Sequence, residues 1–304
     1  MSIAEIESAE LALEGATGGL WREAWYRLRR NPGAILGAFF VLSFVVVAIF
    51  APLIAPYPPE SIPRNLPATC CPGPSSAHLL GTNVVGQDTF SRIVFGARLS
   101  LTVGIVAVAV GLSIGMLLGA IAGYIGGFVD SLIMRMMDIL LSIPGLLLAI
   151  GIVALNLPIG RLYQLMVAIG VTNIPIFARL LRGSILAQRE NDFVLAARSV
   201  GVKRPAILFS HILPNAMSPV IVQGTLALAT AIIDVAALGF LGLGPQDPST
   251  PEWGNMLADA QDYLSAQPLL AVFPGIAIVI SVLGFNLIGD GLREALDPKL
   301  RGRA

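Results

Sequence analysis

Residues 99–129 read LSLTVGIVAVAVGLSIGMLLGAIAGYIGGFV, a stretch that contains no Asp, Glu, Lys or Arg. A helix needs about 20 apolar residues to cross the hydrocarbon core of a bilayer, so this stretch is long enough. Its apolar residues run continuously instead of alternating with polar ones, which argues against a strand of a membrane barrel. Only helices and closed barrels satisfy every backbone hydrogen bond in lipid. We therefore expect a transmembrane helix here.

Further charge-free stretches follow the same pattern. They cover residues 34–59, 139–160, 162–178, 205–233 and 263–289. Together with the first stretch they predict six spans, near residues 34–54, 99–121, 136–156, 162–181, 217–240 and 268–289. The composition agrees, because charged residues make up 12% of the 304 residues, against about 25% in a soluble domain. The expected fold class is an all-α integral membrane protein with six transmembrane helices.

The basic residues divide unequally between the two sides that this topology defines. Fifteen lie on the side of the N-terminus: Arg22, Arg27, Arg29, Arg30, Arg135, Arg179, Arg182, Arg189, Arg198, Lys203, Arg204, Arg293, Lys299, Arg301 and Arg303. Four lie on the other side: Arg64, Arg92, Arg98 and Arg161. Because cytoplasmic loops carry the excess of Lys and Arg, we predict that both termini are cytoplasmic.

This topology divides the chain into four parts. Residues 1–33 form a cytoplasmic segment, in which Trp21, Trp25 and nearby arginines predict a helix lying in the membrane interface. Residues 34–98 hold the first span and a proline-rich extracytoplasmic segment. Residues 99–290 form the core, and residues 291–304 form a cytoplasmic tail. The two adjacent cysteines, Cys70 and Cys71, are too few for a disulfide framework.

The long cytoplasmic loop at residues 183–216 has a helical pattern. Phe193, Ala196, Ala197 and Val200 recur at helical spacing and predict one apolar face. Asn191 or Asp192 can cap the start of this helix.

Gly201 can then end the helix in the left-handed conformation. Pro205 can open a second short helix, which we expect to run from Ala206 to about Leu213 and to end at Pro214. The pattern alone allows two interpretations: the elbow docks on a partner, or it rests on the membrane surface.

The order Leu195-Ala196-Ala197, Gly201 and Leu213-Pro214 resembles the "EAA" loop of the inner-membrane permeases of binding-protein-dependent ABC importers. Leu195 stands where that motif has Glu. The branch most similar is the C-type subunit of dipeptide and oligopeptide permeases. Its other motifs resemble Leu80 to Arg98, Gly123 to Asp138, Gly239 to Gly254 and Phe285 to Pro298, so the similarity runs from about Trp25 to Arg301.

The resemblance implies a type I ABC importer permease fold in a bacterial cytoplasmic membrane. It implies a second permease subunit, two cytoplasmic ATP-binding subunits and an extracytoplasmic substrate-binding protein as partners, with membrane lipid around them and no nucleic acid. The implied ATPase-coupling residues are Phe193, Leu195, Ala196, Ala197, Gly201, Lys203, Arg204, His211 and Pro214. The loop at residues 241–254 is expected either to face the binding protein, through Pro245, Pro251 and Trp253, or to form a ceiling over the pathway.

The sequence contains no motif for binding a nucleotide or a metal ion. A P-loop needs Gly-Lys followed by Ser or Thr, but the lysines, Lys203 and Lys299, follow Val202 and Pro298. We therefore expect no cofactor and no catalytic role, with ATP and Mg²⁺ bound by partner subunits. The two histidines, His78 and His211, fall on opposite sides of the membrane, and no metal-site spacing occurs.

Two polar residues lie inside predicted spans. A carboxylate such as Asp234 is costly there and serves either the transport pathway or the packing of the bundle, and Asn286 has the same two interpretations. Gly111, Gly115 and Gly119 repeat at a spacing of four and permit close helix contact, either within the chain or with the partner permease.

Other functions fit less well. An ion-coupled secondary transporter would need several intramembrane carboxylates or inverted repeats, and a membrane enzyme would need a polar cluster at one face. Within the family, importers of nickel complexes, glutathione or other small solutes remain alternatives to a peptide importer.

Overall fold

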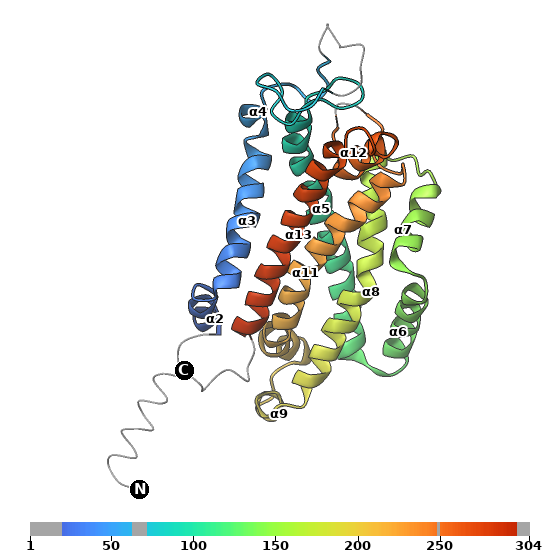
Figure 1. Cartoon of the computed structure of the whole chain (residues 1–304). Coiled ribbons are helices and arrows are strands. Elements are labelled where there is room, and N and C mark those ends of the chain that lie inside the picture. Colours follow the sequence, from blue (N-terminus) through green and yellow to red (C-terminus); the bar gives the residue numbers. More distant parts are fainter. Residues whose placement is uncertain (1–19, 63–71, 248–249, 297–304) are drawn as a thin grey trace, which may run out of the picture.

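The computed structural model describes residues 20–62, 72–247 and 250–296. These ranges contain helices and one isolated bridge, between Thr82 and Asp88, but no named strand. The helices long and apolar enough to cross a membrane are α3 (Pro32–Ile49), α5 (Thr89–Ile125), α8 (Arg161–Arg189), the continuous helix Arg204–Phe240, whose main part is α11 (Leu213–Phe240), and α13 (Leu269–Leu296). A bent pair, α6 (Gly127–Ser142) and α7 (Gly145–Ala154), supplies a sixth candidate span. Figure 1 shows the long helices side by side.

The expected continuous third span at 136–156 is wrong. α6 and α7 are separated at Ile143 and Pro144 and are bent by 89°. Ile143 has an extended backbone (φ −94°, ψ 127°) because the ring of the following proline disfavours a helical conformation there. Pro144 also lacks the N–H that would have continued the helical hydrogen bonds. The span is therefore two helices at an angle.

Local sequence signals explain where the other spans begin and end. The Asn31 side chain accepts a hydrogen bond from the backbone N–H of Ala34 at 3.0 Å, and Pro32 opens α3. The Asp88 side chain accepts one from the N–H of Ser91 at 2.8 Å at the start of α5. α5 ends at Gly126, whose φ of +74° is readily available only to glycine.

The glycines of α5 pack against α8 within the chain, which decides between the two interpretations left open by the sequence. A Cβ atom added to Gly115 would lie 2.7 Å from the carbonyl oxygen of Ile174. One added to Gly111 would lie 2.7 Å from the carbonyl oxygen of Gly170. The two backbones therefore approach each other too closely for any side chain at these positions.

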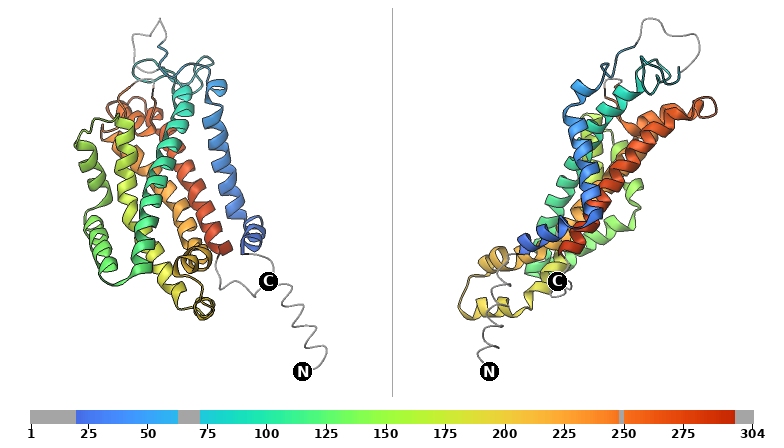
Figure 2. Two further views of the ribbon diagram at one scale, coloured as in Figure 1. Left: turned by 180° about the vertical axis from the view of Figure 1, so that it is seen from behind. Right: turned by 60° about the vertical axis from the view of Figure 1, so that its left-hand side comes forward.

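The bundle has two ends, which we name by their short helices. At the cap end lie α4 (Ala51–Ile54), α12 (Trp253–Ala260) and the 3₁₀ turn at Gln261–Tyr263. At the elbow end lie α2 (Leu20–Leu28), α9 (Asp192–Ser199), α10 (Arg204–Ile207) and the end of α13. Both views in Figure 2 show the same separation of the two ends.

Two buried clusters hold the bundle together. The larger joins α5, α7, α8, α9 and α11 and includes Leu165, Phe177 and Leu238. The smaller joins α3, α5, α11, α12 and α13 around Trp253 and Phe285. The first cluster reaches the elbow and the second reaches the cap, so each end is continuous with the core.

The second short helix of the elbow does not end at Pro214, which corrects the sequence expectation. α10 continues through a π-helical turn at Leu208–Ile212 directly into α11, and Pro214 lies in the first turn of α11. The N–H of Leu213 bonds to the carbonyl of Leu208, five residues back. A π turn shifts the backbone hydrogen bonds from the residue four positions back to the one five positions back. The helix can therefore continue although a proline follows.

The amphipathic N-terminal helix forms as α2. The guanidinium of Arg29 lies 4.5 Å from the ring centre of Trp25, and that of Arg30 lies 4.1 Å from the ring of Tyr26. Both rings are exposed, as expected for aromatic residues at a membrane interface. The side chain of Trp21, Cys70 and Cys71, much of the proline-rich segment, and residues 297–304 of the tail lie outside the described residues.

Candidate functional site

The elbow has the glycine stop that its sequence predicts. Gly201 has φ +80°, and its N–H bonds to the carbonyl of Arg198 at 3.0 Å. The N–H of Val202 bonds to the carbonyl of Ala197 at 3.1 Å. This pair of bonds is the Schellman arrangement, which satisfies the last carbonyls of α9 and reverses the chain toward α10. Gly201 therefore sets the angle between the two short helices.

One side of α9 is anchored in the bundle. Val194 is fully buried and Ala197 is 8% exposed, and both belong to the larger core cluster with Ile207 and Ile212. Of the predicted apolar face, Ala197 is therefore buried, whereas Phe193, Ala196 and Val200 are exposed. Periodicity alone did not show which part of this face is buried.

The rest of α9 is exposed and carries both apolar and polar side chains. We call Phe193, Leu195, Ala196 and Val200 the outer face of α9. Phe193 is 41% exposed, Leu195 49% and Val200 79%. Figure 1 shows α9 at the extreme of the elbow end, next to the end of α8. An apolar patch on a projecting, well-anchored helix is the type of surface that another protein covers.

The remaining predicted coupling residues lie around this helix but do not form one cluster. Lys203 and Arg204 are exposed at the start of α10. His211 is half-buried in the π turn, where its backbone carbonyl accepts a hydrogen bond from the Asn215 side chain at 2.7 Å. Pro214 is exposed in the first turn of α11.

The two predicted pathway residues lie on helices that pack together. Asp234 is half-buried on α11, and Asn286 is half-buried on α13. Among the described residues, neither side chain has a hydrogen bond with a protein group. Asp234 is thus a carboxyl group within a membrane-spanning helix, where a charge is costly.

At the cap end the predicted binding-protein-facing side chains are buried, so the expectation that they face outward is wrong. Trp253 is fully buried, and its indole N–H donates to the carbonyl of Ile93 at 3.1 Å. Its ring lies edge-on to Phe44, with the ring centres 5.8 Å apart. Pro245 and Pro251 are buried as well. These side chains hold the cap onto the bundle instead of forming its outer surface.

Glu252 fixes the start of α12 and was not singled out by the sequence. Its carboxylate is 1% exposed and accepts hydrogen bonds from the backbone N–H groups of Gly254 at 2.8 Å and Asn255 at 2.9 Å. Burial raises the pKa of Glu252 from 4.5 to about 7, and these two hydrogen bonds oppose the rise. Glu is not one of the residues usually preferred at an N-cap, so the sequence carried no clear signal for this role.

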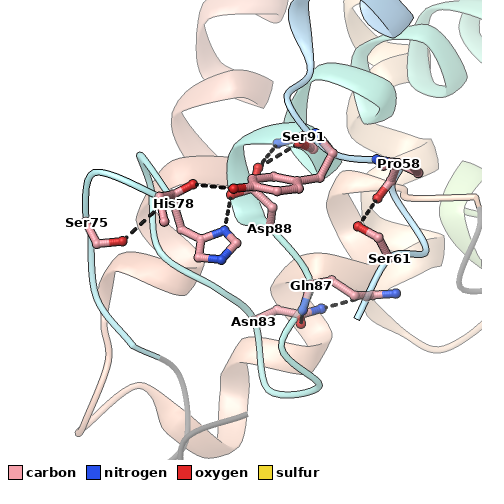
Figure 3. A network of polar contacts seen from close by, with 10 residues as sticks. Pro58, Ser61, Ser75, His78, Asn83, Gln87, Asp88 and Ser91 are labelled. Carbon is pink, nitrogen blue, oxygen red and sulfur yellow. Dashed lines mark hydrogen bonds and ion pairs between the residues drawn. The ribbon is translucent and has the colours of Figure 1, made fainter. Parts of the chain in front are cut away.

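A second polar network orders the chain that enters α5 (Figure 3). One oxygen of Asp88 lies 2.9 Å from Nδ1 of His78, and the other caps α5 through Ser91. Asn83 donates to the side-chain carbonyl of Gln87 at 3.0 Å, and Arg92 donates to the same oxygen at 2.6 Å. Because these side chains bond to one another and to the backbone, the segment that leads into α5 has a defined conformation.

Ion pairs fasten α6 to α8, a contact that the sequence did not reveal. Arg182 makes two hydrogen bonds to Asp130, at 2.5 and 2.6 Å. Arg179 pairs with Asp138 at 2.6 Å, although both side chains are more than half exposed. Residues separated by 41 and 52 positions meet here, so the pairing could be found only from the fold. Within the described ranges, no group of three His, Cys, Asp or Glu residues could hold a metal ion.

The chain matches two known families. Residues 115–302 match the family described as binding-protein-dependent transport system inner membrane component. Residues 19–68 match the N-terminal transmembrane domain of oligopeptide transport permease C.

Named relatives cover nearly the whole chain. The dipeptide transport system permease protein DppC of Alkalihalophilus pseudofirmus is 49% identical over 92% of this chain and 90% of its own. The di/tripeptide transport system permease protein DppC of Pseudomonas aeruginosa is 45% identical over 93% of both chains. The glutathione transport system permease protein GsiD of Salmonella typhimurium is 48% identical over 93% of this chain and 91% of its own.

A solved structure shows the same fold. It is the methionine ABC transporter MetNI in an inward-facing conformation, which is 20% identical, with a TM-score of 0.56 over 68% of this chain and 96% of that one.

Proposed function

The chain belongs to the family of binding-protein-dependent transport system inner membrane components, and on that premise we propose that it is a permease subunit of an ATP-driven importer of dipeptides and oligopeptides. It is a multi-pass membrane protein and a component of transport. The names of its relatives support a short peptide as cargo, and glutathione, itself a tripeptide, is the second candidate because relatives of similar identity carry that name.

The outer face of α9 is the observation that carries the proposal. Its exposed apolar side chains fit a cleft of a cytoplasmic ATP-binding subunit, while Val194 and Ala197 join the same helix to the core. Leu195, in place of the family's Glu, makes this contact by apolar burial instead of by an ion pair. Movement of the ATPase would therefore be passed to the bundle through a short, well-packed helix.

A second permease subunit would cover the broken third span. Residues 141–147, on both sides of the break at Ile143 and Pro144, are all exposed in the isolated chain, although the bent pair is a candidate span. Irregular backbone is tolerated at membrane depth only where protein covers it or where it lines a water-filled space. Both conditions are met if this segment faces the partner permease and the transport pathway between the two subunits.

The proposed orientation puts the elbow end, with both termini, in the cytoplasm and the cap end outside. The excess of Lys and Arg at the elbow end supports it. The cap would then receive the substrate-binding protein over its outer loops, while Trp253, Pro245 and Pro251 keep those loops in place. Membrane lipid would contact α2 and the exposed sides of α3.

ATP and Mg²⁺ would be bound by the partner ATPases, with no catalytic group supplied by this chain. In the proposed cycle, closure of the ATPase pair moves α9, and α8 and α11 tilt with it because they share its core cluster. Nucleotide then biases two conformations of the bundle, which is how binding energy becomes alternating access. Asp234 and Asn286 are pathway candidates in this cycle.

Crosslinking tests the elbow contact. The importer is assembled from this chain, a second permease and ATPases, and Ala196→Cys is treated with a short thiol crosslinker, with Gly183→Cys on α8 as the matched control. We expect Ala196→Cys to crosslink to an ATPase and the control to remain uncrosslinked. An elbow that never reaches an ATP-binding subunit would refute the proposal.

Uptake measurements test the energy source and the cargo. Proteoliposomes that contain the complete importer should accumulate dipeptide when ATP is inside, with or without an ionophore. Ionophore-sensitive uptake without ATP would instead identify a secondary transporter. Competition between dipeptide and glutathione decides between the two cargoes.

A further inference from the structure

A cavity of about 610 Å³ opens at the elbow end, on the inner side of the elbow. It lies between the end of α5, the end of α8 and the two short helices α9 and α10. Three arginines line it, Arg189, Arg198 and Arg204, together with Tyr124 and the apolar side chains of Ile125 and Val202. Each arginine comes from a different helix, so the cavity exists only because the elbow folds back on the bundle.

The positive charge of this cavity is not balanced by its own walls. No acidic residue lines it, and among the described residues none of the three arginines forms an ion pair with a carboxylate. Arg189 is held in place because its Nη1 donates to the carbonyl of Gly123 at 3.0 Å. Three guanidinium groups around one space repel each other, so an anion between them is favoured.

The cavity and the proposed ATPase contact use different sides of α9. Arg198 follows the buried Val194 by four positions, so the two side chains lie on the same side of the helix. Ala196 and Val200, in the outer face, lie on the other side, whereas Leu195, three positions before Arg198, borders the cavity side. An ATPase seated over Ala196 and Val200 would therefore leave the Arg198 side of the helix uncovered.

We propose that this cavity binds the phosphate group of an anionic phospholipid from the cytoplasmic leaflet. Guanidinium groups match phosphate oxygens with paired hydrogen bonds. The cavity adjoins the end of α5, directly after a charge-free span, and Tyr124 is an aromatic residue of the kind enriched at the interface. Basic pockets between membrane helices on this side commonly hold lipid headgroups.

Apolar surface beside the cavity fits the acyl chains of the same lipid. Ile125, which lines the cavity, is 61% exposed, and Phe128, three positions further along the chain at the start of α6, is 81% exposed. A soluble phosphate ester has no acyl chains that could pack against this apolar surface, so the surface favours a lipid over a soluble phosphate. A bound headgroup would bridge α8, α9 and α10 and hold the elbow against α5, so that lipid composition would tune the coupling to the ATPase.

The test measures lipid retention by the complete importer complex. The complex is reconstituted in nanodiscs of phosphatidylcholine with phosphatidylglycerol as the minor component, then transferred to mild detergent and weighed by native mass spectrometry. We expect one retained phosphatidylglycerol that the variant Arg198→Gln/Arg204→Gln binds about thirtyfold more weakly. The matched control, Lys203→Gln/Arg293→Gln, removes the same charge at the same end without touching the cavity and should retain the lipid.

Three outcomes would overturn the proposal. The first is equal lipid retention by the cavity variant and the control. The second is protection of backbone amides 198–207 from hydrogen exchange by inorganic phosphate but not by phosphatidylglycerol, which would assign the site to a soluble phosphate. The third is a crosslink to an ATPase from Val202→Cys, which keeps all three arginines of the cavity, in a complex without retained lipid. Retention needs neither nucleotide nor peptide, so its failure is distinct from failure of the transport function, although the leaflet depends on the proposed orientation.

Discussion

The indole N–H of Trp253 donates a hydrogen bond to the carbonyl of Ile93, 160 positions earlier in the chain, at 3.1 Å. This bond joins α12 to α5, and the Trp253 ring also packs edge-on against Phe44 of α3. One side chain thus connects the cap to two spans.

Replacing Trp253 should therefore loosen the cap. Trp253→Ala removes a fully buried ring, which typically costs 3–5 kcal/mol, and should lower the melting temperature of the purified protein in detergent clearly. Trp253→Phe keeps most of the buried ring but loses the hydrogen bond, which should lower the free energy of unfolding by about 1 kcal/mol. Equal melting temperatures for wild type and Trp253→Ala would show that the cap is not held in this way.

The Glu252 carboxyl should make the stability of the cap depend on pH. Its folded-state pKa, about 7, lies above the ordinary value of 4.5, so the folded protein favours the protonated form. The stability from this group is fully present below pH 4.5 and is lost as the pH rises toward 7. Glu252→Gln keeps a neutral acceptor for the same N–H groups.

The measurement is the melting temperature of wild type minus that of Glu252→Gln, followed across pH. We expect this difference to fall between pH 4.5 and about 7 and to be constant above that range. A difference that rises over this interval would contradict the pKa direction.

Gly201 should be needed for coupling. Its φ of +80° costs a residue with a side chain about 1–2 kcal/mol, so Gly201→Val should distort the turn between α9 and α10. We expect peptide uptake per ATP hydrolysed to fall several-fold in the reconstituted importer. Gly183→Val on α8 is the control, because a Cβ atom there meets no neighbour. Normal coupling in Gly201→Val would refute this role.

The two ion pairs between α6 and α8 should differ in strength. Asp130→Asn weakens a two-bond contact with Arg182 in which both side chains are partly buried, and should destabilise the protein by about 1–3 kcal/mol. Asp138→Asn breaks a pair that is more than half exposed and should cost at most about 1 kcal/mol. Denaturant titration of both variants checks the order, and a larger effect of Asp138→Asn would reverse our interpretation.

Much of the fold and of the elbow followed from the sequence because the controlling effects are local. Long charge-free stretches must cross the membrane as helices whatever surrounds them, and Gly201 stops a helix because of its own backbone freedom. The broken third span was missed because the average apolarity of 136–156 outweighed the single local effect of Pro144.

What only the tertiary structure decided is which side of each element faces inward. Apolar side chains lie on more than one side of α9, and only its packing shows that Ala197 is buried while Val200 is exposed. The sequence placed Trp253 in an outward-facing loop, and only the structure shows that it packs against α3 and α5. Glycine spacing on α5 permits contact with any helix, and the fold selects α8. Periodicity determines that a face exists, whereas its partner depends on long-range contacts between segments that lie far apart in the chain.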